Sequence, residues 1–116
     1  NVKLYGWQVL DLKNCGLNEL PIEIFEYPDI RTIDLSNDSY CDDNMKNKIK
    51  VIPYEVSKLK NLIKLNLSDN KINSIPESIT DLKKLRYLDI SHNNTAFYII
   101  YVSPHMDRCH QGLRPN

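Results

Sequence analysis

The side chains of this sequence that could act as nucleophiles, bases or metal ligands are scattered along its 116 residues. Three cysteines, Cys15, Cys41 and Cys109, are widely spaced and form neither a CxxC pair nor a disulfide framework. Near the carboxyl end, His105, Cys109 and His110 follow one another at irregular spacing, which is a weak pattern for a metal site. We therefore expect reduced thiols, no metal site and no cofactor.

Motifs typical of enzymes are also missing from the sequence. Ser, His and Asp do not combine on a recognisable turn, there is no GxxxxGK[ST] loop, and the three glycines make no phosphate cradle. Asp42, Asp43 and Asn44 are adjacent, but they lack the alternating ligands and the glycine of a calcium loop. The sequence predicts a non-catalytic protein without a small-molecule substrate.

Charge and hydropathy exclude two further classes of partner. Fifteen basic and fifteen acidic residues cancel and interleave, so the chain offers no basic groove for nucleic acid. The longest apolar run, 96–102, is far shorter than the roughly 20 residues of a membrane helix. No secretory signal opens the chain, which does not start with Met. We expect a cytoplasmic protein that inserts into no membrane.

The elements that must position the remaining side chains follow from apolar spacing between Leu62 and Leu85. Leu65 and Leu67 alternate with polar residues, which is the period of a short, half-buried strand. From Ile75 onward, apolar residues recur at gaps of 4, 3 and 3, which form one stripe on a helical turn. Pro76 suits the start of such a segment. The stretch predicts a strand, a tight turn and a short helix or 3₁₀ segment.

This unit recurs, as it must if its inward face is to be buried. Units start near residues 7, 30, 62 and 85, at intervals of 23, 32 and 23. A Leu-Pro or Ile-Pro step recurs at Pro21, Pro53 and Pro76. The longer interval holds an excess of nine residues, which we place in an insertion at about 39–48 and interpret as a projecting, solvated loop.

These units resemble leucine-rich repeats, whose signature is LxxLxLxxNxL. The similarity is greatest to the intracellular class with the pattern LxxLxLxxNxLxxLPxxIxxLxx, typical of Ras-associated scaffolds and of repeat regions attached to signalling enzymes, and it covers residues 4 to about 95. It implies an α/β solenoid of about four coils, with a parallel concave sheet and short helical or 3₁₀ segments on the convex side. The array would occupy 1–95, followed by a degenerate terminal coil or a disordered tail at 96–116. Because Leu4 falls inside the helical half of a unit, we expect a fragment of a longer array.

The signature also implies a column of turn residues where each strand ends. A buried Asn there donates to and accepts from backbone groups that the turn removes from the sheet. Cys15, Asp38, Asn70 and Asn93 are the expected members. Cysteine is an accepted substitute, as a small buried thiol. Asp38 departs from the pattern, because an ionised carboxylate cannot donate.

Outward residues of the predicted strands line the concave face and are the candidate binding site. Arg and Tyr are frequent anchors of protein interfaces. The alternative is that the acidic column is routine consensus and only solvates the sheet. The candidate partner-binding residues are Arg31, Lys64, Arg86, Tyr87, Asp34, Asn66 and Asp89.

Two functions are compatible with this sequence. The first is a non-catalytic interaction module that binds a protein partner on its concave face. The second is the recognition region of a larger intracellular enzyme, such as a Roco-type GTPase, a kinase or a ubiquitin ligase. A catalytic domain in the flanking sequence would favour the second.

Overall fold

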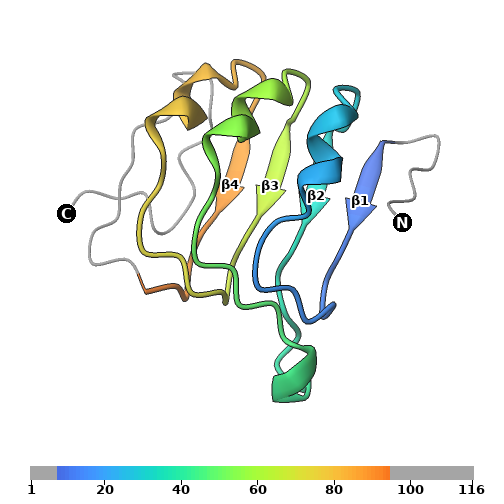
Figure 1. The fold of residues 1–116 in the computed structure, drawn as a ribbon, viewed down its shortest axis with the longest axis vertical. Coiled ribbons are helices and arrows are strands. Elements are labelled where there is room, and N and C mark those ends of the chain that lie inside the picture. Colours follow the sequence, from blue (N-terminus) through green and yellow to red (C-terminus); the bar gives the residue numbers. More distant parts are fainter. Residues whose placement is uncertain (1–7, 95–116) are drawn as a thin grey trace.

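The computed structural model describes residues 8–94. The expectations about Leu4, the apolar run 96–102 and the tail to residue 116 lie outside the described residues. One four-stranded sheet runs through the molecule in the order β1-β2-β3-β4, and every pairing is parallel (Figure 1). The strands are β1 (Val9–Asp11), β2 (Thr32–Asp34), β3 (Lys64–Asn66) and β4 (Tyr87–Asp89). The predicted parallel sheet of an α/β solenoid is confirmed, and we number the coils one to four after these strands.

The register of the sheet stacks equivalent residues of successive coils. Leu10 pairs with Ile33, Ile33 with Leu65, and Leu65 with Leu88, and all four side chains are buried. Each strand is one residue shorter than the sequence predicts. The residue that follows it still donates its N–H to the next coil, as when Leu12 donates to the Asp34 carbonyl at 2.8 Å.

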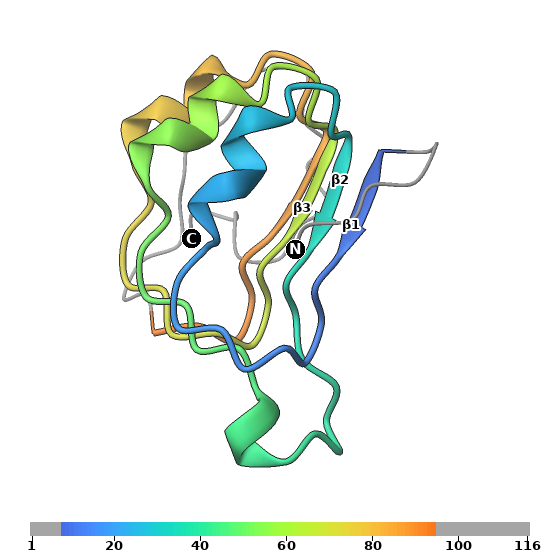
Figure 2. The same ribbon diagram turned by 45° about the vertical axis from the view of Figure 1, so that its right-hand side comes forward.

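Three short 3₁₀ segments form the layer opposite the sheet (Figure 2). They are η1 (Ile22–Glu26), η3 (Tyr54–Lys58) and η4 (Glu77–Asp81). Pro21, Pro53 and Pro76 directly precede them, with φ angles of −65°, −71° and −73°. Each proline carbonyl accepts the N–H three residues on, at 3.1–3.2 Å, so proline stands one position before the helical turn and accepts its first bond.

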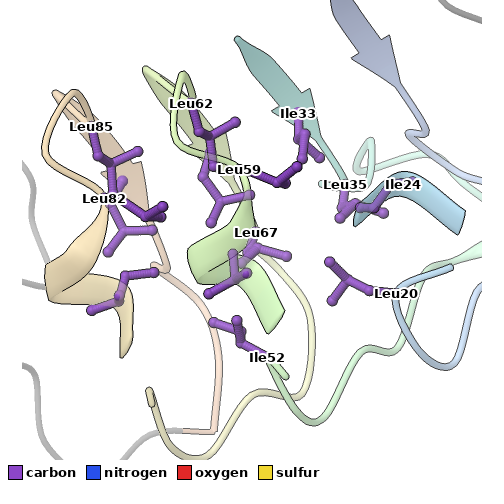
Figure 3. Packing of buried hydrophobic residues seen from close by; sticks show 14 of the residues in the cluster. Leu20, Ile24, Ile33, Leu35, Ile52, Leu59, Leu62, Leu67, Leu82 and Leu85 are labelled. Carbon is purple, nitrogen blue, oxygen red and sulfur yellow. The ribbon is translucent and has the colours of Figure 1, made fainter. Parts of the chain in front are cut away.

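Aliphatic side chains fill the space between the sheet and the 3₁₀ layer (Figure 3). Leu62 and Leu67 come from the third coil's strand region, and Leu59 and Leu82 come from the ends of η3 and η4. All four are 0% exposed. One continuous core therefore joins the coils, as expected for repeats that cannot bury their inward faces alone.

The second coil carries a loop that projects beyond the other turns and includes η2 (Asp43–Met45) (Figures 1 and 2). Its base lies against the first coil. The Gly16 N–H donates to the Met45 carbonyl at 2.8 Å, and a Cβ at Gly16 would meet the Asn44 carbonyl oxygen at 3.2 Å. With φ at +65°, position 16 suits glycine for both reasons.

Candidate functional site

Asparagine carboxamides hold the turns at the ends of the strands. The Asn70 Oδ1 accepts the Ile49 N–H at 2.9 Å, and its Nδ2 donates to the Leu35 carbonyl at 3.0 Å. Asn93 repeats this one coil later, accepting from Ile72 at 2.8 Å and donating to Leu67 at 2.9 Å. Each asparagine therefore completes the turn of the preceding coil.

In the second coil the column residue is Asn47, and the assignment of Asp38 is wrong. Asn47 is 1% exposed; its Oδ1 accepts the Leu17 N–H at 2.9 Å, and its Nδ2 donates to the Leu12 carbonyl at 2.8 Å. Asp38 is exposed and exchanges two hydrogen bonds with Asn14, at 2.8 and 2.9 Å. The extra residues precede the column position, so counting forward from the strand reaches Asp38 too early. Counting back 23 residues from Asn70 would have found Asn47.

Cys15 takes the first place in the column, but its thiol is exposed, not buried as expected. The Sγ approaches the Lys13 carbonyl oxygen at 3.5 Å, and the backbone N–H of Cys15 donates to Asn47 at 3.3 Å. No coil precedes the first among the described residues, so this position has no described turn to complete. That explains why a thiol stands where the later coils need a carboxamide.

The residue before the column residue turns left-handed in three of the four coils. Asn14, Asp69 and His92 have φ angles of 54°, 61° and 57°. Asn, Asp and His are the side-chain-bearing residues that tolerate this conformation best. Sequence analysis missed this role, although the residue types at the shared offset carry the signal.

The acidic column of the concave face has a structural role. The Asp34 Oδ1 accepts both the N–H and the hydroxyl of Ser36, at 3.0 and 2.6 Å. Asp89 does the same with Ser91 at the same distances, and the Asn66 Oδ1 accepts the Ser68 N–H at 3.1 Å. These side chains cap the exits of the strands, so at least one oxygen of each is committed to its own turn.

A basic and aromatic cluster stands beside that column. Lys64 pairs with Tyr87 in the register of β3 and β4, and its Nζ lies 5.0 Å from the centre of the Tyr87 ring. Such a contact contributes roughly 0.5–1 kcal/mol at an exposed site. Arg86 is exposed and directly precedes Tyr87 in the chain. The structure thus brings Lys64, Arg86 and Tyr87 together on adjacent coils.

Arg31 belongs to the same row of residues at the entrances to the strands. The Ile63 N–H donates to the Arg31 carbonyl and the Arg86 N–H to the Ile63 carbonyl, both at 2.8 Å. Arg31 therefore lies two coils from Arg86, about 10 Å at the usual strand spacing. Within residues 8–94 the ion pair found joins Lys48 and Asp43, so both arginines keep their charge for an outside group.

Comparison with known proteins agrees with this geometry. A family model described as "Leucine rich repeat" matches residues 45–94. The chain is a leucine-rich repeat protein. A solved leucine-rich repeat protein of Leptospira interrogans is similar to it, with a TM-score of 0.58 and 30% identity over 68% of this chain. The match covers 18% of that longer protein. No curated protein matches the sequence.

Two negative findings apply to the described part of this leucine-rich repeat protein. Residues 8–94 contain no helix of the length and hydropathy needed to cross a membrane. They also contain no group of three or more His, Cys, Asp or Glu side chains that could hold a metal ion.

Proposed function

We propose that the concave sheet of this protein binds a protein partner, with the binding energy centred on Lys64, Arg86 and Tyr87. Leucine-rich repeat domains are generally interaction modules. The observation that carries the proposal is the contact between the Lys64 ammonium and the Tyr87 ring on neighbouring strands. It fixes a flat aromatic surface and a positive charge on a rigid sheet, so little side-chain entropy is lost when a partner docks.

The chemistry of the cluster indicates the partner surface. Tyr and Arg combine contact area with directed hydrogen bonds, which makes them frequent hot spots. Arg31, Lys64 and Arg86 supply three positive charges along the entrances and first residues of the strands. The carboxylates of Asp34 and Asp89 lie one column further on and are engaged by Ser36 and Ser91. We therefore expect an acidic partner surface that meets the basic side of the sheet.

The test is affinity capture of a partner with the whole chain, followed by titration of single variants. Arg86→Ala and Tyr87→Ala should each weaken binding by more than about 1 kcal/mol, roughly fivefold. Tyr54→Ala is the matched control, because Tyr54 is 70% exposed on η3, in the layer opposite the sheet. Thermal unfolding of each variant checks that the fold is kept.

A control in the loop separates the concave face from its rim. Lys46→Ala should act mainly on the association rate and its salt dependence. If Tyr54→Ala or Lys46→Ala abolishes binding while both concave variants bind normally, the concave assignment is wrong.

A second proposal concerns the protein to which these coils belong. The chain spans 18% of the length of the Leptospira protein that it matches, which supports a repeat region within a larger protein. We propose a cytoplasmic setting, and the host could be a Roco-type GTPase, a kinase or a ubiquitin ligase. The full reading frame is the test: a catalytic domain beside the coils would support this proposal, and flanking sequence without one would contradict it.

A further inference from the structure

A basic hollow lies beside the asparagine column, on a different surface from the concave cluster. It encloses about 470 Å³, and its lining consists of lysine and asparagine side chains without a carboxylate. Three coils contribute two positions each, or one in the case of the first and last. The lining residues are Asn18, Lys48, Lys50, Lys71, Asn73 and Asn94.

The backbone that carries these side chains is held in a second ladder of hydrogen bonds. The Lys48 N–H donates to the Leu17 carbonyl at 2.7 Å, and the Lys71 N–H donates to the Ile49 carbonyl at 2.9 Å. Ile49 stands between Lys48 and Lys50 and is 0% exposed. Its burial turns the two flanking lysines outward on the same side, so their positions are fixed by the core.

The charge of the hollow is unusual for this protein. The whole sequence has a formal net charge of zero, yet three ammonium groups gather here. Like charges held together on a rigid surface repel one another, and a bound anion relieves that repulsion. The three asparagines add amide N–H donors, which suit oxyanions.

The loop supplies a carboxylate that already occupies one lysine. The Asp43 Oδ2 lies 3.2 Å from the Lys48 Nζ, and the Asp43 side chain is 86% exposed. An exposed ion pair of this kind is weak and open to exchange. Asp43 therefore acts as a displaceable competitor at the mouth of the hollow.

We infer that the hollow is a binding site for a small, multiply charged phosphate group, either a soluble polyphosphate or a phosphorylated headgroup. Several lysine point charges with amide donors match an anion that carries many oxygens. No arginine or aromatic side chain lines the hollow, so it lacks the stacking surface that single-stranded nucleic acid requires.

The test titrates the whole chain with inorganic tripolyphosphate and follows backbone amide resonances. We expect saturable shifts at Lys48, Lys50, Lys71 and Asn73. The variant Lys48→Gln/Lys50→Gln/Lys71→Gln should weaken binding at least about tenfold. The matched control, Lys58→Gln/Lys60→Gln/Lys83→Gln, removes the same charge from the 3₁₀ side and should change affinity less than about threefold. Asp43→Asn should tighten binding about two- to threefold by removing the competitor.

Two further measurements identify the source of the anion and its chemistry. Binding to vesicles that contain a phosphoinositide, stronger than binding to tripolyphosphate and lost in the hollow variant, would assign the site to a headgroup; the reverse order would assign it to a soluble ligand. A tetraglutamate peptide that binds as tightly as tripolyphosphate would overturn the phosphate assignment. Equal losses in the hollow and control variants, or no binding to either probe, would overturn the site itself.

Discussion

The second and third coils make the same turn with different lengths of chain. In the third coil two residues separate Leu67 from the column residue Asn70, whereas eleven separate Leu35 from Asn47 in the second. Both asparagines are buried and both tie their turn to the coil before. The position of the carboxamide in space is therefore kept, although its distance from the strand along the chain is not.

Asn37 makes this tolerance possible. Its Oδ1 accepts the Asn47 N–H at 2.7 Å, and its Nδ2 donates to the Asn47 carbonyl at 2.9 Å and to the Asp69 carbonyl at 2.7 Å. One side chain thus closes the base of the loop and binds it to the next coil. The loop of residues 38–46 adds to the turn without disturbing the ladder beneath it.

The comparison predicts that the two coils share one core, and core truncation tests this most strongly. Leu35→Ala and Leu67→Ala should each lower the free energy of unfolding by about 2–5 kcal/mol, because both side chains are 0% exposed. Chemical denaturation measures the effect. If Leu35→Ala costs almost nothing, the loop has loosened the second coil and the two coils are not equivalent.

Removal of the column asparagines should have the next largest effect. Asn47→Ala and Asn70→Ala should each cost about 2–4 kcal/mol, since each leaves buried backbone donors and acceptors without a partner. Asp38→Ala is the matched control and should cost less than about 1 kcal/mol, because Asp38 is exposed. A larger loss for Asp38→Ala than for Asn47→Ala would restore Asp38 to the column.

Asn37→Ala should have an intermediate effect. It removes the three hydrogen bonds at the base of the loop, and we expect a loss of about 1–2 kcal/mol. Hydrogen exchange should localise the change, with faster exchange at the Asn47 N–H and unchanged exchange at Leu67. Uniformly faster exchange across the sheet would show that the clamp supports the whole fold.

Deletion of residues 38–46 should change stability by only about 1 kcal/mol in either direction. The deletion joins Asn37 to Asn47 and gives the order Leu, Ser, Asn, Asn, close to Leu67, Ser68, Asp69 and Asn70 of the third coil. Asn37 would then take the left-handed position, which asparagine tolerates. Circular dichroism and thermal unfolding provide the measurement, and failure to fold would show that the loop is essential.

The smallest expected effect is on the chemistry of the loop. Partial burial raises the pKa of the Cys41 thiol; Lys46 opposes the rise, while Asp42, Asp38 and Asp43 add to it. Less thiolate is then present near neutral pH, so alkylation of Cys41 should be slower in the folded protein than in urea. A Cys15→Ser/Cys109→Ser background isolates the signal. Lys46→Gln should slow the reaction further, and faster alkylation in that variant would contradict the assignment.

The sequence was sufficient for the strands, the 3₁₀ layer and the inward leucines, because a period of 23 residues repeats their spacing. It misled at Asp38, where the pattern can be counted from either side of the insertion and only the count from Asn70 is right. Hydrogen bonding decides between the two counts, since a buried turn needs a group that both donates and accepts.

The binding surfaces were less accessible to prediction. Outward columns follow from strand alternation, yet the contact between Lys64 and Tyr87 depends on register and rotamer. The basic hollow was missed because Lys48 was counted with the loop. Its neighbours Lys50 and Lys71 are 21 residues apart in the chain and lie on one surface only once the coils are stacked.

Since every column asparagine serves the coil before it, the stack has a direction. A coil added or duplicated at the amino-terminal side requires nothing of its own turn residue, as Cys15 illustrates, but relies on the asparagine of its successor. A coil added on the other side must bring a carboxamide for its predecessor. Recombination that grows or shortens such an array is therefore unequal at its two ends, and grafted coils should be chosen with their successor, not with the coil they follow.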